Sequence, residues 1–299
     1  MRAGDLISSL NKTRPILIAG PTGCGKSALA IRIATTLGGL IINADAMQVY
    51  AGWRILTARP TKNDEMATSH ALYGHINNLE TYSVGDWLQQ IKPLLDGPER
   101  PIIVGGTGLY FKALTEGLAE IPKIPEKIKT EASDFIKTGR LSDMIGELDV
   151  ETRSKIDLKN PVRVARAWEV WRTTGKSITF WQANTPVAYL NYEKCDAICL
   201  HGPTPWLNQR IEGRFKTMLR NGVLAEVERN FKKWNSTLQS SQVIGAAELI
   251  DHLSGDLSIE KASELAIIAS RQYAKRQRTW FRKRMAAWTN VDAEKLWQL

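Results

Sequence analysis

The chain has 299 residues, 43% of them hydrophobic and 24% charged, which is ordinary for one large globular domain or for one domain that carries a second. This composition excludes a dominantly disordered chain, and the absence of any apolar run near the roughly 20 residues of a membrane span excludes a membrane-spanning one. Lysine and arginine number 40 against 31 aspartates and glutamates, and the net charge of +9 favours polyanionic partners such as nucleic acid, an anionic membrane or phosphorylated small molecules.

The first third of the chain alternates short apolar runs with helical patterns. Apolar runs at residues 16–19, 40–42 and 101–104 each end in glycine or polar residues, and a fourth candidate follows at 197–200. Continuous apolar runs of this kind are typical of parallel strands that helices cover on both faces. A helical stretch follows the first run from residue 27 to about 37. The pattern therefore predicts an α/β fold built on a parallel sheet with helices on both faces.

A phosphate-loop motif lies between the first run and the first helix. The pattern G-x-x-x-x-G-K-[ST] is matched by Gly20, Pro21, Thr22, Gly23, Cys24, Gly25, Lys26 and Ser27. Backbone N–H groups and the helix N-terminus would hold phosphate oxygens, Lys26 would reach the terminal phosphate, and the Ser27 hydroxyl would ligate Mg²⁺. The motif predicts a P-loop NTPase-like fold that binds a diphosphate. No other core strand ends in Asp-Glu or Asp-Asp, as expected of a motor ATPase, so the loop favours a transferase.

Polar residues follow the second and third runs as well. Asp45 and Thr107 each come just after a predicted strand, and ligands of open parallel sheets bind outside the strands' carboxyl ends. Asp45 could therefore accept a proton, bind a ribose or hold a metal through water, with a helix N-cap or Asx turn as the structural alternative. For Thr107 the alternative is a loop hydroxyl bonded to its own backbone.

The middle of the chain has a different pattern. Residues 118–186 show amphipathic helical patterns without a strong strand, and one helix is expected from Asn160-Pro161 to Gly175. We therefore predict a core of residues 1–117 and 187–299 with a mainly helical insertion at 118–186, and a chain that is helical from Pro205 to its end.

Two groups of arginines could contact nucleic acid. Arg271, Lys275, Arg278 and Arg282 fall on one helical face, interleaved with Tyr273, Trp280, Phe281 and Trp288, which could stack on bases. The alternative is a solvated face over core aromatics. In the insertion, Arg163 and Arg166 lie one turn apart and could grip one phosphate or a base edge.

The motifs together resemble the tRNA dimethylallyltransferases, also called tRNA isopentenyltransferases. Besides the phosphate loop, the segments that carry the resemblance occur in the family's order at residues 43–50, 57–60, 104–110, 160–166, 174–176, 210–215 and 271–282. The resemblance implies transfer of a dimethylallyl group from its diphosphate to N6 of the adenosine at tRNA position 37, beside the anticodon. In that family the loop holds the diphosphate of the isoprenoid donor and not ATP.

The resemblance also implies roles for single residues. Asp45 matches the general base, Thr107 its companion in the channel, and Lys26 with Mg²⁺ and Arg210 or Arg214 would stabilise the leaving diphosphate. The residues implied to contact the tRNA anticodon stem-loop are Asp45, Ala46, Met47, Gln48, Thr107, Lys129, Val162, Arg163, Val164, Ala165 and Arg166. The charge of the basic C-terminal face adds Arg271, Lys275, Arg278 and Arg282 as expected tRNA contacts. We expect a monomer that acts in the cytoplasm without a membrane partner.

The sequence departs from the family's usual pattern at four places. Ala46 stands where serine is usual, Leu56 replaces glycine, Arg59 replaces lysine, and Ala246-Ala247 stands where tyrosine and a basic residue are often found. Three other functions stay open at this stage: an isopentenyltransferase acting on free adenine nucleotides, a P-loop small-molecule kinase, and a non-catalytic nucleotide-switched RNA-binding protein. The insertion favours an RNA substrate over the first of these.

The cysteines give a further expectation. Cys24, Cys195 and Cys199 are an odd, scattered set, which suits a reducing compartment, and the N-terminal residues lack a signal-peptide stretch. A thiol beside Lys26 at a helix N-terminus is expected to have a lowered pKa, so we predict that Cys24 can be alkylated and that bound diphosphate protects it. The histidines show no metal-ligand spacing.

Overall fold

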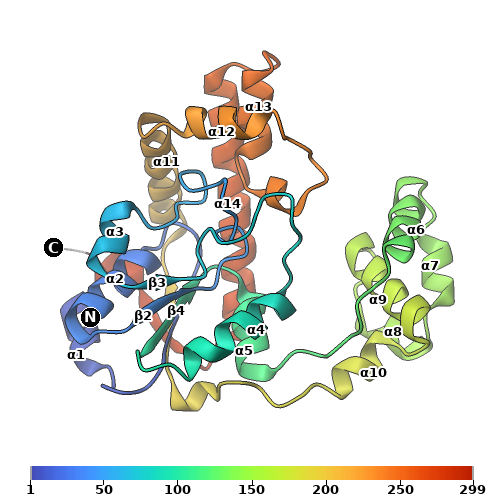
Figure 1. The fold of residues 1–299 in the computed structure, drawn as a ribbon, viewed down its shortest axis with the longest axis horizontal. Helices are drawn as coiled ribbons and strands as arrows, with labels where there is room; N and C mark the ends of the chain where they lie inside the picture. The colour runs from blue at the N-terminus through green and yellow to red at the C-terminus, as the bar shows by residue number, and fades with distance from the viewer. Residues whose placement is uncertain (1, 298–299) are drawn as a thin grey trace. The chain divides into compact units, whose positions relative to one another are not determined.

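The computed structural model describes residues 2–297, which contain a six-stranded, wholly parallel sheet (Figure 1). The order of the strands is β3-β2-β4-β1-β5-β6. The strands are β1 (Ile16–Ala19), β2 (Leu40–Asn43), β3 (His70–Ala71), β4 (Pro101–Gly105), β5 (Asp196–His201) and β6 (Thr289–Asp292). The α/β, P-loop-like fold is therefore confirmed, with four of the strands where the sequence predicted them.

Two strands were missed. The strand β3 has only two residues, and β6 lies in the segment that was predicted to be helical to the end. The sequence Thr289–Asp292 lacks the continuous apolar pattern because its first two residues are exposed and only Val291 is buried. Edge strands of this kind have a weak sequence signal, and the prediction of an all-helical C-terminus was wrong.

The register brings three strand ends to one edge of the sheet. Ala19 pairs with Gly105, and Asn43 pairs with Val104, so β1, β2 and β4 end together. Gly105 is required there, because an added Cβ would lie 1.9 Å from the carbonyl oxygen of Ala44. The loops after these strands therefore begin side by side, as predicted for the loops that carry Asp45 and Thr107.

Helices cover both faces of the sheet. Alternate strand residues such as Ile16, Ile18 and Ile41 pack in one apolar cluster with α1 (Ala3–Ser9), α2 (Lys26–Leu37) and α11 (Thr204–Arg220). The intervening Leu17 and Ile42 point to the opposite face. On that face the indole of Trp87 in α4 (Val84–Leu95) donates to the carbonyl of Asn43 at 2.7 Å and stacks on Tyr110 of α5 (Gly108–Glu116).

The helices that accompany the sheet, in chain order, are α1 (Ala3–Ser9), α2 (Lys26–Leu37), α3 (Lys62–Ala67), α4 (Val84–Leu95), α5 (Gly108–Glu116), η1 (Tyr192–Lys194), α11 (Thr204–Arg220), α12 (Val223–Phe231), η2 (Gln239–Gln242), α13 (Ala246–Leu253), α14 (Ile259–Arg284) and α15 (Ala293–Leu296). Among the described residues, none of these helices or those below is long and apolar enough to cross a membrane.

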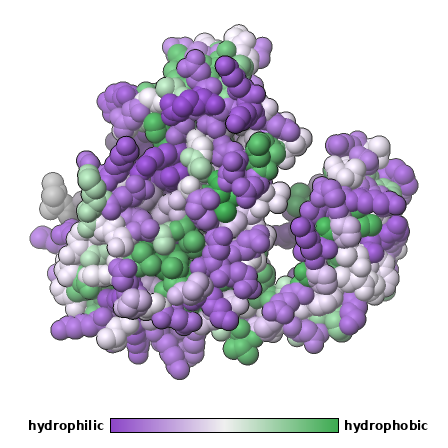
Figure 2. All heavy atoms as spheres, in the orientation of Figure 1, coloured by the Kyte–Doolittle hydropathy of each residue, from purple (hydrophilic) through white to green (hydrophobic). Residues whose placement is uncertain are grey.

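The chain divides into two compact units, one made of the residues up to 115 with those from 190, the other of residues 116–189. The second unit holds α6 (Glu126–Lys137), α7 (Leu141–Glu147), α8 (Val150–Lys155), α9 (Pro161–Thr174) and α10 (Ile178–Ala183). Its own core surrounds Trp168, and α9 begins at the cap Asn160 and ends at Gly175, as the sequence predicted. The visible surface of each unit is mostly hydrophilic (Figure 2).

Candidate active site

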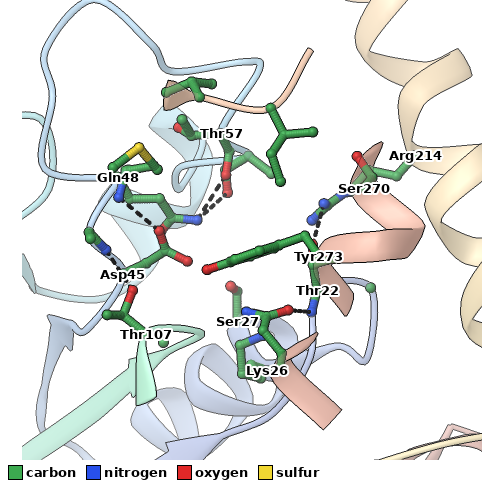
Figure 3. A pocket seen from close by; sticks show the side chains of 18 of the residues that line it. Thr22, Lys26, Ser27, Asp45, Gln48, Thr57, Thr107, Arg214, Ser270 and Tyr273 are labelled. Carbon is green, nitrogen blue, oxygen red and sulfur yellow. Dashed lines mark hydrogen bonds between the residues drawn. The ribbon is translucent and has the colours of Figure 1, made fainter. Parts of the chain in front are cut away.

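A cavity of about 570 Å³ lies in the first unit, at the carboxyl edge of the sheet (Figure 3). Its wall is formed by the loops after β1, β2 and β4, by residues of α11 and α14, and by Tyr73 and residues 242–244. Its polar lining comprises Thr22, Lys26, Ser27, Asp45, Gln48, Thr57, Thr107, Arg210, Arg214, Gln242, Ser270, Tyr273, Arg276 and Gln277. The structure thus brings together the predicted catalytic residues and the predicted arginine ligands of the diphosphate.

The phosphate loop forms one side of the cavity. Gly25 has a φ of 91°, a conformation that glycine adopts without strain, and α2 begins at the next residue, Lys26. The Lys26 ammonium donates to the carbonyl of Pro21 at 2.9 Å, which holds it over the loop. Ser27 is exposed to the cavity beside it. Loop amides, an ammonium group and a helix N-terminus at one point form an anion site.

Side chains from α11 and α14 fix this loop. Gln277 is buried; its amide oxygen accepts from the N–H of Thr22 at 2.8 Å, and its amide nitrogen donates to the carbonyl of Gly106 at 2.8 Å. Arg210 donates to the carbonyl of Gly23 at 2.7 Å, and Arg214 donates to the Thr22 hydroxyl. Burial lowers the pKa of Arg214, and the nearby Asp45 carboxylate partly opposes this effect. The guanidinium stays cationic because the ordinary pKa of arginine lies far above neutral pH.

Asp45 faces the loop from the other side of the cavity. Its N–H donates to the side chain of Asn43 at 2.9 Å, and its Oδ1 accepts from the N–H of Met47 at 3.0 Å. Thr107 completes the turn, because its hydroxyl accepts from the N–H of Ala46 at 2.9 Å. No helix begins at Asp45, so this residue is not a helix N-cap. The alternative Asx turn is present, because Oδ1 of Asp45 accepts from the N–H of Met47. The carboxylate points into the cavity, toward the Tyr273 hydroxyl (Figure 3).

A buried carboxylate holds the next segment of this side. Glu226 in α12 is 3% exposed and accepts from the N–H groups of Arg54, Ile55 and Leu56 at 2.7, 2.8 and 2.9 Å. The following carbonyl, that of Thr57, accepts from the Gln48 side-chain amide at 2.9 Å. Glu226 therefore positions the loop that carries Leu56, Thr57 and Ala58 into the cavity wall.

The second unit carries the other predicted tRNA contacts. Val162, Arg163 and Arg166 are exposed on α9, and Arg166 lies 3.7 Å from Glu169. Lys129 of α6 lies 3.2 Å from Glu126. Contact of these residues with tRNA stays a prediction.

Two predicted contacts in α9 are corrected by the structure. Val164 and Ala165 are 0% and 7% exposed and pack in the core of the second unit. Their side chains face away from solvent because a helix that packs on its neighbours buries one stripe of its surface. Contact of these two side chains with tRNA was therefore wrong.

Two of the four cations on the basic face of α14 are engaged within the protein, which differs from the predicted open surface for nucleic acid. Arg271 lies 3.0 Å from Glu212, and Arg278 donates to the Thr204 hydroxyl, so both are directed against α11. Lys275 and Arg282 are exposed and stay predicted contacts. The stacking role is wrong for two of the aromatic residues, because Phe281 and Trp288 are 3% and 7% exposed and belong to the core.

The predicted reactivity of Cys24 is wrong. The residue is 0% exposed, packs in the same apolar cluster as Ile16 and Ile18, and does not line the cavity, although its sulfur lies 4.0 Å from the Lys26 ammonium. The other thiols are also buried, and burial raises the pKa of Cys195 to about 11 and that of Cys199 to about 12. Within residues 2–297, no group of three or more His, Cys, Asp or Glu side chains could hold a metal ion.

Sequence reasoning assigned no role to three residues that the structure places at the site, Glu226, Arg276 and Gln277, and considered Tyr273 only for stacking on bases. Tyr273 and Gln277 lie in the motif that carried the resemblance, one turn apart on α14, and their spacing was the signal that could have found them. Glu226 had no local signal, because its partners lie about 170 residues earlier in the chain.

A phosphate loop and a carboxylate that face one cavity define the class: a P-loop enzyme that binds a phosphorylated substrate and can remove a proton beside it. The sequence model of the family described as IPP transferase matches residues 48–284, and that described as isopentenyl transferase matches residues 14–77. The chain belongs to the IPP transferase family.

Relatives in sequence support the same assignment. The chain is 50% identical over 278 residues to a tRNA dimethylallyltransferase of Cereibacter sphaeroides strain KD131, covering 93% of this chain and 88% of the relative. It is 49% identical over 288 residues to that of Dinoroseobacter shibae, covering 95% and 97%.

Solved structures agree with these relatives. A tRNA isopentenylpyrophosphate transferase from Bacillus halodurans matches with a TM-score of 0.65 and 30% identity over 94% of this chain and 90% of that one. A eukaryotic dimethylallyltransferase acting on tRNA matches with a TM-score of 0.78 and 25% identity, over 94% and 74% of the two chains.

Proposed function

We propose that this chain transfers the dimethylallyl group of dimethylallyl diphosphate to N6 of the adenosine at position 37 of tRNA and releases diphosphate. The observation that carries the proposal is the pairing of a phosphate loop with Asp45 across one cavity. A donor whose diphosphate lies on the loop would extend its allylic carbon toward the carboxylate. The family membership and the names of the relatives support the reaction over a kinase or a non-catalytic RNA-binding protein.

The donor side stabilises the leaving group. As the C1–O bond of the donor breaks, its electron pair goes to the diphosphate, where negative charge grows. Lys26, the loop amides and the cationic Arg210 and Arg214 face that charge and stabilise it more strongly than they stabilise the bound donor.

The residues also fit a Mg²⁺ ion in one specific way. In the described part of the chain no carboxylate cluster could hold the ion by itself, so its ligands would be the Ser27 hydroxyl and oxygens of the diphosphate. When bound, Mg²⁺ would neutralise charge on the diphosphate and so favour its departure.

The acceptor side removes a proton. The N6 amine becomes acidic as it forms the new N–C bond, and the Asp45 carboxylate accepts its proton. Thr107 holds the turn that aims Asp45. The adenine has to leave its stack to reach this cavity, and a base beside the anticodon is in a loop where that costs little. We propose that Lys129, Val162, Arg163 and Arg166 bind the anticodon stem-loop, and that the enzyme acts as a monomer in the cytoplasm.

The test is a transfer assay with labelled dimethylallyl diphosphate, Mg²⁺ and one of three acceptors: tRNA that lacks the modification, AMP, or the same tRNA with position 37 changed to guanosine. Label should enter only the first, at the N6 atom of adenosine 37. Label in AMP would instead support the nucleotide enzyme, and ATP turnover without label transfer would support a kinase. Lys26→Ala should lose most of the transfer, whereas the exposed Lys12→Ala should not.

A further inference from the structure

Tyr273 occupies the middle of the cavity. It projects from α14, and its ring lies between Asp45 on one side and Ser27 and Lys26 on the other, with its hydroxyl toward Asp45 (Figure 3). A group that passes from the phosphate loop to a nucleophile at Asp45 therefore passes along this ring.

The ring is held in this place. One turn further along α14, Gln277 bonds to both the phosphate loop and the loop after β4, and the adjacent Ala274 is 3% exposed. The backbone that carries Tyr273 is consequently fixed to the phosphate loop and to the loop after β4, whose Thr107 in turn bonds to the residue after Asp45. A fixed group contributes more to a transition state than one that has to be ordered during the reaction.

The phenol is neutral under working conditions. Burial and the Asp45 carboxylate raise its pKa above the ordinary value. An un-ionised phenol ring has a negative face that attracts cations. The Arg276 guanidinium lies 5.7 Å from the ring centre, within the range of such an attraction, so the ring already has one cation beside it.

We propose that Tyr273 is a catalytic residue of the prenyl transfer, whose ring lies against the allylic carbons and stabilises their positive charge. This inference rests on the proposed function. The C1–O bond breaks with its electron pair going to the diphosphate, the N6 lone pair forms the bond to C1, and the N6 proton goes to Asp45. The ring makes and breaks no bond; it attracts the cation while charge is separated and keeps water from it.

The first experiment compares two variants in single-turnover transfer from dimethylallyl diphosphate to tRNA. Tyr273→Phe keeps the ring and should retain the rate within about threefold, whereas Tyr273→Leu should slow it about 10- to 30-fold, the size of a desolvated cation–π contact. The Kd for inorganic diphosphate should change less than twofold in both. Phe231→Leu, which alters an exposed ring on α12 outside the cavity, is the control and should leave the rate unchanged.

The second experiment separates electronic from steric effects. Phenylalanine with one, two, three and five ring fluorines at position 273 keeps the shape and progressively weakens the negative face of the ring. The logarithm of the single-turnover rate should fall steadily along the series. A rate that is independent of the number of fluorines, or a Tyr273→Leu variant with an unchanged rate, would overturn the role of the ring. In that case the proposed function would still hold if Asp45→Asn and Lys26→Ala lose transfer activity. Absence of any transfer by the unaltered enzyme would overturn both.

Discussion

The two sides of the cavity are built in different ways. The phosphate-loop wall, residues 22–28, owes its shape to local glycine conformations and the start of α2, and Arg214 and Gln277 only hold it in place. The acceptor wall, residues 44–48 and 54–58 with Thr107, contains no helix or regular strand; it is shaped by side chains that bond to its backbone, from Asn43 to Glu226. The motif that encodes the phosphate site thus lies within eight consecutive residues, 20–27, whereas the site for the nucleophile depends on contacts distributed over the whole unit.

The largest expected effect lies on the acceptor wall. Asp45→Asn keeps an oxygen for the N–H of Met47 but removes the proton acceptor, so kcat should fall by about 10²- to 10⁴-fold. The Kd for inorganic diphosphate should remain within twofold, because the phosphate-loop wall is untouched. Single-turnover kinetics and calorimetry measure the two quantities; a chemical step slowed by less than threefold would show that Asp45 is not the base.

The next effect tests how the acceptor wall is held. Glu226→Gln keeps an oxygen but turns an N–H₂ group toward one of the backbone donors of residues 54–56, and should lower the free energy of unfolding by about 1–3 kcal/mol. Glu228→Gln changes an exposed carboxylate on the same helix and should alter it by less than about 0.5 kcal/mol. Denaturant unfolding compares them, and equal stabilities would mean that Glu226 does not fix this wall.

The corresponding substitution on the phosphate-loop wall, Gln277→Leu, should weaken the binding of diphosphate. Gln277→Leu leaves the N–H of Thr22 and the carbonyl of Gly106 without their partner, so the loop should lose order and bind inorganic diphosphate about tenfold more weakly. In Glu226→Gln the same Kd should change less than twofold. If both variants weaken diphosphate binding equally, the two walls are not independent.

A smaller effect concerns the arginines outside both walls. Arg163 and Arg166 are exposed, so replacing both with alanine should make the salt dependence of tRNA binding less steep. The slope of the logarithm of the binding constant against the logarithm of the salt concentration should decrease in magnitude by about one for each lost phosphate contact. Arg271→Ala with Arg278→Ala is the comparison, and its slope should change less because both side chains are engaged by α11. Binding titrations over a range of salt concentrations give the slopes; the reverse order would assign the RNA surface to α14.

The smallest effect is expected for the thiols. Burial raises the pKa values of Cys195 and Cys199 to about 11 and 12, so almost no thiolate exists at pH 8 and labelling by iodoacetamide should be slow and should rise with pH. Cys24 is shielded by packing, and diphosphate should not change its labelling rate. Rapid labelling of Cys24 in the folded protein, followed by mass spectrometry, would contradict the structure.

The sequence by itself determined the parts of this protein whose signals are local. Consecutive residues encode the four buried strands, the phosphate loop and the ends of α9, because glycine conformations, caps and apolar runs act within a few residues. The positions of Asp45 and Thr107 just after two predicted strands also predicted that they meet at the loop, since parallel strands end at one edge. Only the tertiary structure decided which cations of α14 are engaged, that Val164, Ala165 and Cys24 are buried, and that Glu226, Tyr273 and Gln277 belong to the site. Burial and long-range hydrogen bonds depend on which surfaces pack together. The sequence of a helix does not by itself determine which of its sides faces a neighbouring element.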